Sequence, residues 1–274
     1  MNKQELEKIA NEVRKGIVFS VYSAKSGHPG GSLSCADILT YLYYEEMKNI
    51  GPENQGDPGR DRFVLSKGHA APALYSVLAE KGYFDKKELG NLRHVGANLQ
   101  GHPDMHRTPG VDMSTGSLGQ GISTACGMAL AGKIDKKDYR VFTLLGDGEL
   151  EEGEVWEAAM FASAKKLDNL VAIVDNNDLQ IDGRIGDVNS PYPIADKFEA
   201  FGFNVALADG HDFDSLKEAF DKAKEQNGKP WVIVCKTIKG KGVSFMEDQA
   251  GWHGKAPNDE EFKIAMDELE SVGA

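Results

Sequence analysis

The feature that most constrains the fold is an alternation of short, β-type apolar runs with segments of helical spacing. The runs that we expect to form strands are 62–65, 140–145, 170–174, 203–207 and 231–235. Helical spacing is found in 1–25, 33–48, 69–81, 118–133, 150–167, 215–227 and 258–270. Because strands joined through helices run parallel, the pattern predicts an α/β fold with a doubly wound, mostly parallel sheet and helices on both faces.

The length of 274 residues suits one large domain, and no internal repeat, low-complexity tract or linker divides the chain. We therefore expect residues 1–274 to form a single domain. Asp and Glu number 43 against 31 Lys and Arg, which gives a formal net charge of -12, and no basic stripe is present. Such a chain would repel a polyanion, so nucleic acid is not an expected partner.

Neither a signal peptide nor a membrane span is expected. The N-terminal segment carries charges throughout, and no apolar run approaches the roughly 20 residues needed to cross a bilayer. A cytoplasmic location is the expectation that follows. The three cysteines are far apart among apolar neighbours, so we expect them to fill the core rather than form a disulfide or bind zinc. They are Cys35, Cys126 and Cys235.

A Gly-Asp-Gly sequence at 146–148 directly follows one predicted strand, and Asn177, thirty positions beyond Asp147, follows the next. Because the carboxyl ends of neighbouring parallel strands share one edge of the sheet, the two side-chain oxygens are expected side by side. Mg²⁺ prefers oxygen ligands and is usually bound by one or two protein groups together with phosphates. The spacing therefore predicts a metal and diphosphate site, although each segment alone could equally form a tight turn or a strand end.

Four of the seven histidines stand in the short motifs Ser-Gly-His-Pro-Gly, Ser-Lys-Gly-His, Gly-His-Pro and Trp-His-Gly, whose glycine and proline residues place the side chains on loops. They are His28, His69, His102 and His253. Imidazole can donate, accept or transfer a proton near neutral pH, so these loops could contact a sugar or a phosphate. The other three are expected to be structural, with His211 as part of the cap of a helix at Asp212 or Asp214. They are His94, His106 and His211.

These motifs together resemble the thiamine diphosphate enzymes. The Gly-Asp-Gly sequence followed by an asparagine about thirty residues later is the signature of those enzymes, and the glycine-flanked histidines are similar to the motifs of transketolase in particular. The resemblance covers about residues 16–257. It implies the thiamine diphosphate-binding fold of the diphosphate type, with thiamine diphosphate and Mg²⁺ as cofactors and Ca²⁺ or Mn²⁺ as substitutes for the metal.

The resemblance also implies a role for each matching residue. Metal ligands would be the side chains of Asp147 and Asn177 and the carbonyl of Leu179. Further cofactor contacts would come from His69, Gly116, Ser117, Leu118, Gly148, Asn177, Lys239 and His253. The histidines expected to meet the hydroxyl groups and carbonyl oxygen of the ketose donor are His28, His102 and His253. Lys67 and Lys241 could equally be solvated surface residues.

The implied reaction transfers a two-carbon ketol unit from a ketose phosphate to an aldose phosphate. The resemblance reaches only the first domain of a usual transketolase, so the glutamate that contacts the aminopyrimidine of the cofactor has no counterpart here. A C-terminal transketolase subunit that supplies this glutamate is therefore an implied partner. Self-association as a dimer would give an assembly of two copies of each chain, with Glu152 and Glu157 at a subunit interface and Glu151 and Glu154 in solvent.

Four alternatives stay open. A 2-oxoacid dehydrogenase α subunit would explain Asp147 and Asn177 but not the early histidine motifs. A transketolase relative for another sugar, including a deoxy or sulfonated one, would share all of them. The chain could also be a silent subunit that only anchors the cofactor. Finally, a longer protein cut at a domain boundary would give the same sequence.

Overall fold

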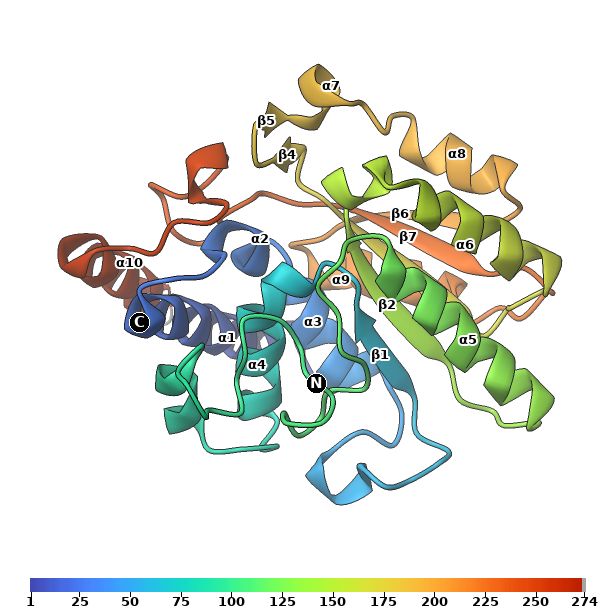
Figure 1. Cartoon of the computed structure of the whole chain (residues 1–274), viewed down its shortest axis with the longest axis horizontal. Coiled ribbons are helices and arrows are strands. Elements are labelled where there is room, and N and C mark those ends of the chain that lie inside the picture. Colours follow the sequence, from blue (N-terminus) through green and yellow to red (C-terminus); the bar gives the residue numbers. More distant parts are fainter. Residues whose placement is uncertain (273–274) are drawn as a thin grey trace.

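The computed structural model describes residues 1–272, and a five-stranded parallel sheet forms its centre (Figure 1). All neighbouring strands in the sheet are parallel. In spatial order they are β1 (Arg62–Leu65), β2 (Val141–Gly146), β3 (Leu170–Asn176), β7 (Trp231–Lys236) and β6 (Asn204–Asp209). The doubly wound, mostly parallel sheet predicted from the alternating pattern is thus confirmed. A short antiparallel ribbon of β4 (Leu179–Gln180) and β5 (Gly183–Arg184) follows β3.

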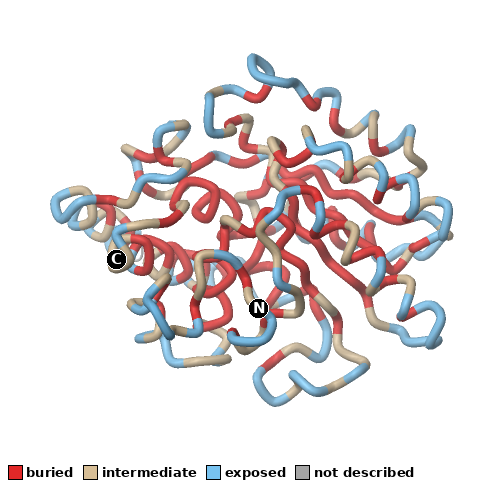
Figure 2. Tube along the Cα trace, viewed as in Figure 1, coloured by how far each residue is buried: buried red, intermediate tan, exposed pale blue. Residues whose placement is uncertain are grey.

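Helices cover both faces of the sheet and create two separate apolar clusters. Alternate residues of β3 enter different clusters, because successive side chains of a strand point to opposite faces: Ile173 enters one, and Ala172 and Val174 the other. The first face is covered by α1 (Lys3–Ala24), α2 (Pro29–Leu33), α3 (Ala36–Tyr41), α4 (Ala71–Glu80), α9 (Phe213–Lys222) and α10 (Asp259–Ser271). The second face is covered by α5 (Gln120–Ile134), α6 (Gly153–Ala164) and α8 (Ile194–Ala200). Figure 2 shows the strands as the most continuously buried part of the chain. One further short helix, α7 (Ile185–Val188), follows β5.

Helix boundaries depart from the sequence pattern mainly at residues 33–48. The expected single helix is instead α2, α3 and one turn of π-helix at Leu42–Glu46. The hydroxyl group of Ser32 donates to the carbonyl of His28 at 2.7 Å, which offers the backbone an alternative to helical bonding. The expected helix at 150–167 likewise divides into a 3-10 turn at Gly148–Glu151 and α6.

Helices α1 and α10 lie against each other although they come from opposite ends of the chain. The buried side-chain amide of Asn11 donates to the carbonyl of Leu269 at 2.7 Å, and the ring of Tyr22 stacks on Phe262 with centroids 3.9 Å apart. Each helix begins with a capping box, in which an asparagine and a glutamate three residues later satisfy the free N–H groups of the first turn.

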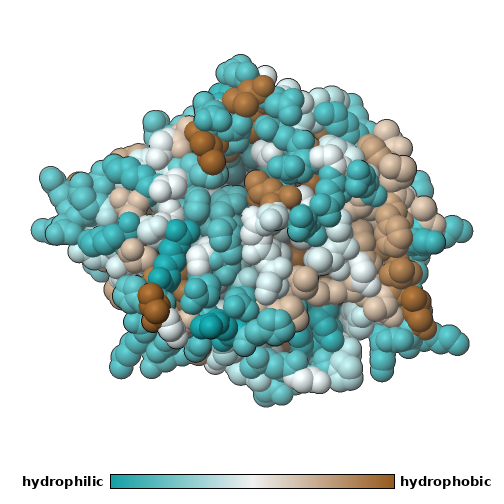
Figure 3. All heavy atoms as spheres, viewed as in Figure 1, coloured by the Kyte–Doolittle hydropathy of each residue, from teal (hydrophilic) through white to brown (hydrophobic). Residues whose placement is uncertain are grey.

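The three cysteines are buried and unbridged, as expected. None of the helices in the described part of the chain combines the length and the apolar character needed to cross a bilayer. The surface is mostly hydrophilic, but apolar groups gather over the part where α5 and α6 lie (Figure 3). On the outer sides of these helices, Ile134, Met160 and Phe161 are 69%, 58% and 40% exposed.

Candidate cofactor and substrate site

The candidate site lies at the carboxyl ends of four parallel strands. Lys67 follows β1, Asp147 follows β2, Asn177 follows β3 and Lys239 follows β7. These four side chains line one cavity of about 390 Å³. Further residues named from the sequence line the same cavity, and they are His28, His69, Gly116, Leu118, Gly148, Leu179 and His253. The carboxyl edge of the sheet therefore gathers nearly all of the predicted site residues.

Asp147 is buried at the turn that follows β2. Its Oδ1 accepts the N–H of Gly148 at 2.8 Å, and its Oδ2 accepts the N–H of Asp178 at 2.5 Å. Burial, followed by the nearby charge of Asp175, raises the pKa of Asp147 to about 7. A buried carboxylate of this kind is stabilised in its charged form by a cation, because the backbone donors alone do not replace its hydration.

Asn177 and Leu179 place two more oxygen atoms beside Asp147. The side-chain Nδ2 of Asn177 donates to Asp175 at 3.3 Å, and its Oδ1 lies 3.2 Å from the N–H of Leu179. The carbonyl of Leu179 already accepts a cationic donor, the ammonium group of Lys239, at 2.8 Å. One carboxylate, one amide and one carbonyl form a set of hard oxygen donors, which fits the coordination preferred by Mg²⁺.

A buried ion pair between Asp175 and Lys67 lies next to Asn177. Asp175 bonds to the ammonium group of Lys67 and also accepts bonds from Ser34, Asn177 and Thr237. Burial alone would raise the pKa of Asp175, but Lys67 and the hydroxyl donors hold it below its ordinary value. Only 2% of Lys67 is exposed, so the expectation that it could be a solvated surface residue is wrong.

Lys239 adds a second buried cation on the other side of Asp147. Burial lowers the pKa of Lys239 to about 8, against the opposing effect of the Asp147 charge. By contrast, Lys241 is partly exposed and pairs with Glu247 at 3.3 Å, as a surface residue would. Asp147, Lys67 and Lys239 thus line the cavity, and Asp175 is buried behind Lys67 as its ion-pair partner.

Three imidazole rings form one cluster in the wall of the cavity. The ring centroids of His28, His69 and His253 are 5.2 to 5.4 Å apart. Burial is the main cause that lowers the pKa of His28 to about 4 and that of His253 to about 3, and it lowers the pKa of His69 well below its ordinary value. All three rings are therefore uncharged at neutral pH, so each can both donate and accept a hydrogen bond.

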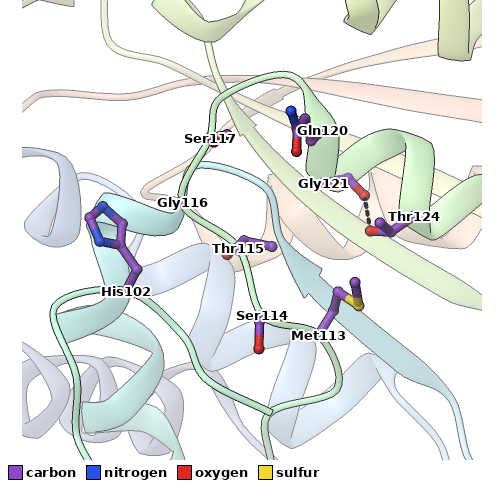
Figure 4. Close-up of a pocket in the computed structure, with 9 residues that line it drawn as sticks. All are labelled: His102, Met113, Ser114, Thr115, Gly116, Ser117, Gln120, Gly121 and Thr124. Atoms are coloured by element: carbon purple, nitrogen blue, oxygen red, sulfur yellow. Dashed lines mark hydrogen bonds between the residues drawn. The ribbon is translucent and has the colours of Figure 1, made fainter.

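His102 and Ser117 line a second, adjoining cavity of about 470 Å³ (Figure 4). Gly116 lines both cavities and lies beside the His102 ring. A Cβ atom at Gly116 would lie 3.4 Å from Cδ2 of His102, so the absence of a side chain lets this segment pass close to the imidazole. Gly116 is the residue common to the two linings, so the predicted histidines border two neighbouring cavities rather than a single pocket.

A family model described as transketolase, thiamine diphosphate binding domain, matches residues 6–270 of this chain. The chain belongs to the transketolase family. Its sheet and helices also superpose on the transketolase of Campylobacter jejuni with a TM-score of 0.92 and 36% identity, over 98% of this chain and 43% of that one.

Relatives of this transketolase domain fall into two size classes. It is 48% identical to the 6-deoxy-6-sulfo-D-fructose transketolase subunit SqwG of Clostridium sp. (strain MSTE9) over 98% of both chains. It is 42% identical to an apulose-4-phosphate transketolase subunit of Phocaeicola vulgatus, over 98% of this chain and 95% of that relative. Human transketolase is 47% identical over 92% of this chain, which spans only 40% of the human protein.

Two buried carboxylates of this transketolase domain have no signal in the sequence. Glu149 accepts bonds from the hydroxyl of Ser66 at 2.5 Å and from the N–H groups of Gly119 at 2.9 Å and Gly146 at 3.0 Å. It thus joins the loop before α5 to the Gly-Asp-Gly turn. Glu149 belongs to an acidic run that is typical of a solvated helix face, and Asp175 is one of several polar residues at the end of a strand. No local sequence pattern therefore distinguishes either residue from its neighbours.

The expectation that His211 belongs to a helix cap is wrong. Asp212 caps α9 by accepting the N–H of Asp214, whereas the His211 ring contacts Asp37 and the backbone of Ile238. Glu151 also differs from expectation, because it is half-buried and lines the first cavity with Glu152. His94 and His106 are exposed and line neither cavity.

Proposed function

We propose that this chain is the N-terminal subunit of a two-chain transketolase that transfers a two-carbon ketol unit from a ketose phosphate to an aldose phosphate. The observation that carries the proposal is the cavity at the strand ends, where oxygen donors suited to a metal lie opposite a cluster of uncharged histidines. The near-complete coverage of two relatives that are named as subunits supports the two-chain organisation.

In this proposal Asp147, Asn177 and the Leu179 carbonyl hold Mg²⁺, which in turn binds the diphosphate of thiamine diphosphate. Gly148, His69, Lys239 and His253 contact the diphosphate side of the cofactor. The segment Gly116 to Leu118 packs against its rings, which agrees with its position between the two cavities. When bound, thiamine diphosphate supplies the stabilisation of negative charge that carbon–carbon cleavage requires.

The histidines perform the part of the chemistry that belongs to this chain. His28, His102 and His253 orient the ketose by hydrogen bonds to its hydroxyl groups and carbonyl oxygen. Because the rings are uncharged, each can donate to one oxygen and accept from another, and no charge repels a polar substrate from the cavity. Holding the sugar in one orientation lowers the entropic part of the activation barrier.

A partner subunit completes the site. We assign residues 1–274 to a single cofactor-binding domain and place the pyrimidine-binding and C-terminal domains, with the glutamate that contacts the aminopyrimidine, on the partner chain. The apolar outer sides of α5 and α6 have the character of a protein interface. Glu152 and Glu157 are exposed beside them, where a second chain could bury them in an assembly of two copies of each subunit.

The test is to purify this chain alone and with a C-terminal subunit, supply thiamine diphosphate and Mg²⁺, and assay ketol transfer from xylulose phosphate to ribose phosphate. Activity only in the combined sample is expected. Full activity of the chain alone would contradict the half-site organisation. Decarboxylation of a 2-oxoacid without ketol transfer would favour the 2-oxoacid dehydrogenase alternative, and cofactor binding without turnover would indicate an anchoring subunit.

A second candidate differs only in the sugar. The 48% identity to a subunit of a 6-deoxy-6-sulfo-D-fructose transketolase is observed over almost the whole chain. We therefore include 6-deoxy-6-sulfo-D-fructose and apulose 4-phosphate as donors in the same assay. A preference of tenfold or more in kcat/KM, equivalent to about 1.4 kcal/mol of transition-state stabilisation, would assign the substrate.

A further inference from the structure

Arg93 connects the two loops that carry His28 and His102. Its Nη1 donates to the hydroxyl of Ser26 at 2.7 Å, and its Nη2 lies 3.4 Å from Nδ1 of His28. On the other side, a Cβ atom at Gly101 would lie 3.1 Å from Nε of Arg93, so the guanidinium packs directly over the glycine that precedes His102. No sequence motif singled out this residue.

The backbone of Arg93 is held in an unusual conformation that aims the side chain at these loops. Its φ angle is 63°, in the left-handed region that non-glycine residues seldom occupy, and its N–H donates to the carbonyl of Leu99 at 2.8 Å. A conformation of this kind persists only where the surrounding contacts determine it.

The positive charge of Arg93 has no acidic counterpart in the described chain. Among residues 1–272 no Asp or Glu oxygen lies within 4.0 Å of its nitrogens, and its Nε is buried without a hydrogen-bond partner. A half-buried guanidinium is normally paired with a carboxylate, because burial removes its hydration. The side-chain groups that its nitrogens contact are the Ser26 hydroxyl and Nδ1 of His28.

We propose that Arg93 is a positioning residue that holds His28 as a single uncharged tautomer, with the proton on Nε2. The argument for the tautomer is chemical. A guanidinium can only donate hydrogen bonds, so the nitrogen that faces it, Nδ1 of His28, must present its lone pair. The single ring proton then resides on Nε2, which can donate to a sugar oxygen in the cavity that His28 lines.

Electrostatics supports the same arrangement. The charged and titratable groups that face His28 are Arg93 and Lys239, both cationic, and the rings of His69, His102 and His253. After burial, Arg93 is the largest cause that lowers the pKa of His28, and it is the only charged group that lowers the pKa of His102. A carboxylate in the same position would stabilise the imidazolium instead.

That a sugar oxygen accepts the hydrogen bond from His28 rests on the proposed function. The tautomer of the His28 ring does not depend on it. The test therefore uses the full chain labelled with ¹⁵N, without partner or substrate. Two-bond ¹H–¹⁵N correlation spectra report both the tautomer and the titration of each histidine. Arg93→Met keeps an unbranched apolar side chain and removes the charge and the donors, whereas Arg93→Lys keeps the charge. Arg107→Gln is the matched control, because Arg107 is an exposed arginine of the same loop region.

The expected result for Arg93→Met is a rise in the pKa of His28 by about one unit or more, together with a mixture of tautomers. Arg93→Lys should retain most of the lowered pKa, and Arg107→Gln should match the wild type. A packing role alone would leave the tautomer unchanged. If His28 keeps one tautomer and its wild-type pKa in Arg93→Met, the proposal is wrong.

Should Arg93→Met not fold, Ser26→Ala tests the same point, because it removes only the hydroxyl that fixes Nη1. Mixed tautomers of His28 in that variant would support the proposal, and an unchanged single tautomer would contradict it. If the assembled enzyme shows no ketol transfer at all, the proposed function fails while the NMR result on Arg93 still stands.

Discussion

Nδ1 of His211 lies 2.7 Å from Oδ2 of Asp37, which places an imidazole between helix α3 and the loop after β7. The other ring nitrogen accepts the N–H of Ile238 at 2.9 Å, so Nδ1 carries the proton and donates to Asp37. Arg14 pairs with the same carboxylate and donates from Nε to the Lys241 carbonyl at 3.2 Å. The loop that carries Lys239 is thereby held at both of its ends.

His211→Ala is expected to destabilise the fold by about 1–3 kcal/mol, because it leaves the Ile238 N–H without its acceptor and removes one of the two donors to Oδ2 of Asp37. Urea unfolding measures this loss, and amide hydrogen exchange at Ile238 should accelerate. His106→Ala, at an exposed histidine, is the control. Unchanged exchange at Ile238 would show that the imidazole does not restrain the loop.

Stability should fall in acid through Asp37. Burial would raise the pKa of this carboxyl, but Arg14 and His211 outweigh it and hold the pKa below its ordinary value. A carboxyl whose folded pKa is lowered contributes stability above its unfolded pKa of about 3.9, and this contribution is lost as pH falls through the folded value. The difference in unfolding free energy between wild type and Asp37→Asn should therefore shrink below about pH 4. If the difference in unfolding free energy stays constant from about pH 6 to about pH 3, a range that includes this unfolded pKa, the mechanism is excluded.

Asp147→Ala and Asn177→Ala should each weaken binding of thiamine diphosphate with Mg²⁺ by roughly tenfold or more, since each removes a proposed metal ligand. Isothermal titration calorimetry on the full chain measures the affinity. Asp187→Ala is the control, because Asp187 is an exposed carboxylate of the neighbouring helix α7. If both Asp147→Ala and Asn177→Ala bind the cofactor with wild-type affinity, the proposed metal site is wrong.

His102→Ala should lower turnover more than cofactor affinity. The ring lines the second cavity, whereas the proposed metal ligands line the first. A lost contact that strengthens in the transition state lowers kcat, whereas a lost cofactor contact raises the concentration of thiamine diphosphate needed for saturation. Normal turnover at saturating cofactor would place His102 among the cofactor contacts instead.

Glu152→Gln together with Glu157→Gln should change the assembly state of the complex or its affinity for the cofactor. Both carboxylates are exposed in this chain, and burial against a second chain would require each to share a proton or find a donor. Analytical ultracentrifugation with and without the partner measures the assembly. If the double variant matches the wild type in both properties, the interface role is contradicted and both residues are solvent-exposed in the assembly.

Local patterns were sufficient for the sheet and for the placement of Asp147 and Asn177 at one edge of it, whereas most other residues of the cavity were expected from the resemblance to transketolase. The strand predicted at 62–65 coincides with β1, and the spacing between Asp147 and Asn177 placed two oxygen donors at the same edge. Both follow from the period of side chains along a strand and from the parallel connection between strands.

What could not be predicted depends on contacts between distant positions. Lys67 looks like a surface lysine until Asp175, 108 positions later, is placed against it. Arg93 and His211 belong to no local motif. Their contacts with His28 and with Ile238 form only in the folded chain, where loops from distant parts of the sequence meet. The break between α2 and α3 is similar, because the hydroxyl of Ser34 has its side-chain partner 141 positions away.

The contact between α1 and α10 has a consequence for how the molecule comes together and comes apart. Asn11 and Leu269 are 258 positions apart, so their hydrogen bond closes almost the largest loop that the chain can form. The entropy of closing such a loop is recovered only after the intervening sheet has brought the two helices near each other. Docking of α10 is therefore expected late in folding, and its release is expected to be an early, partial opening that leaves the strands intact. The strand ends that form the cavity would then stay folded after the contact between α1 and α10 has been lost.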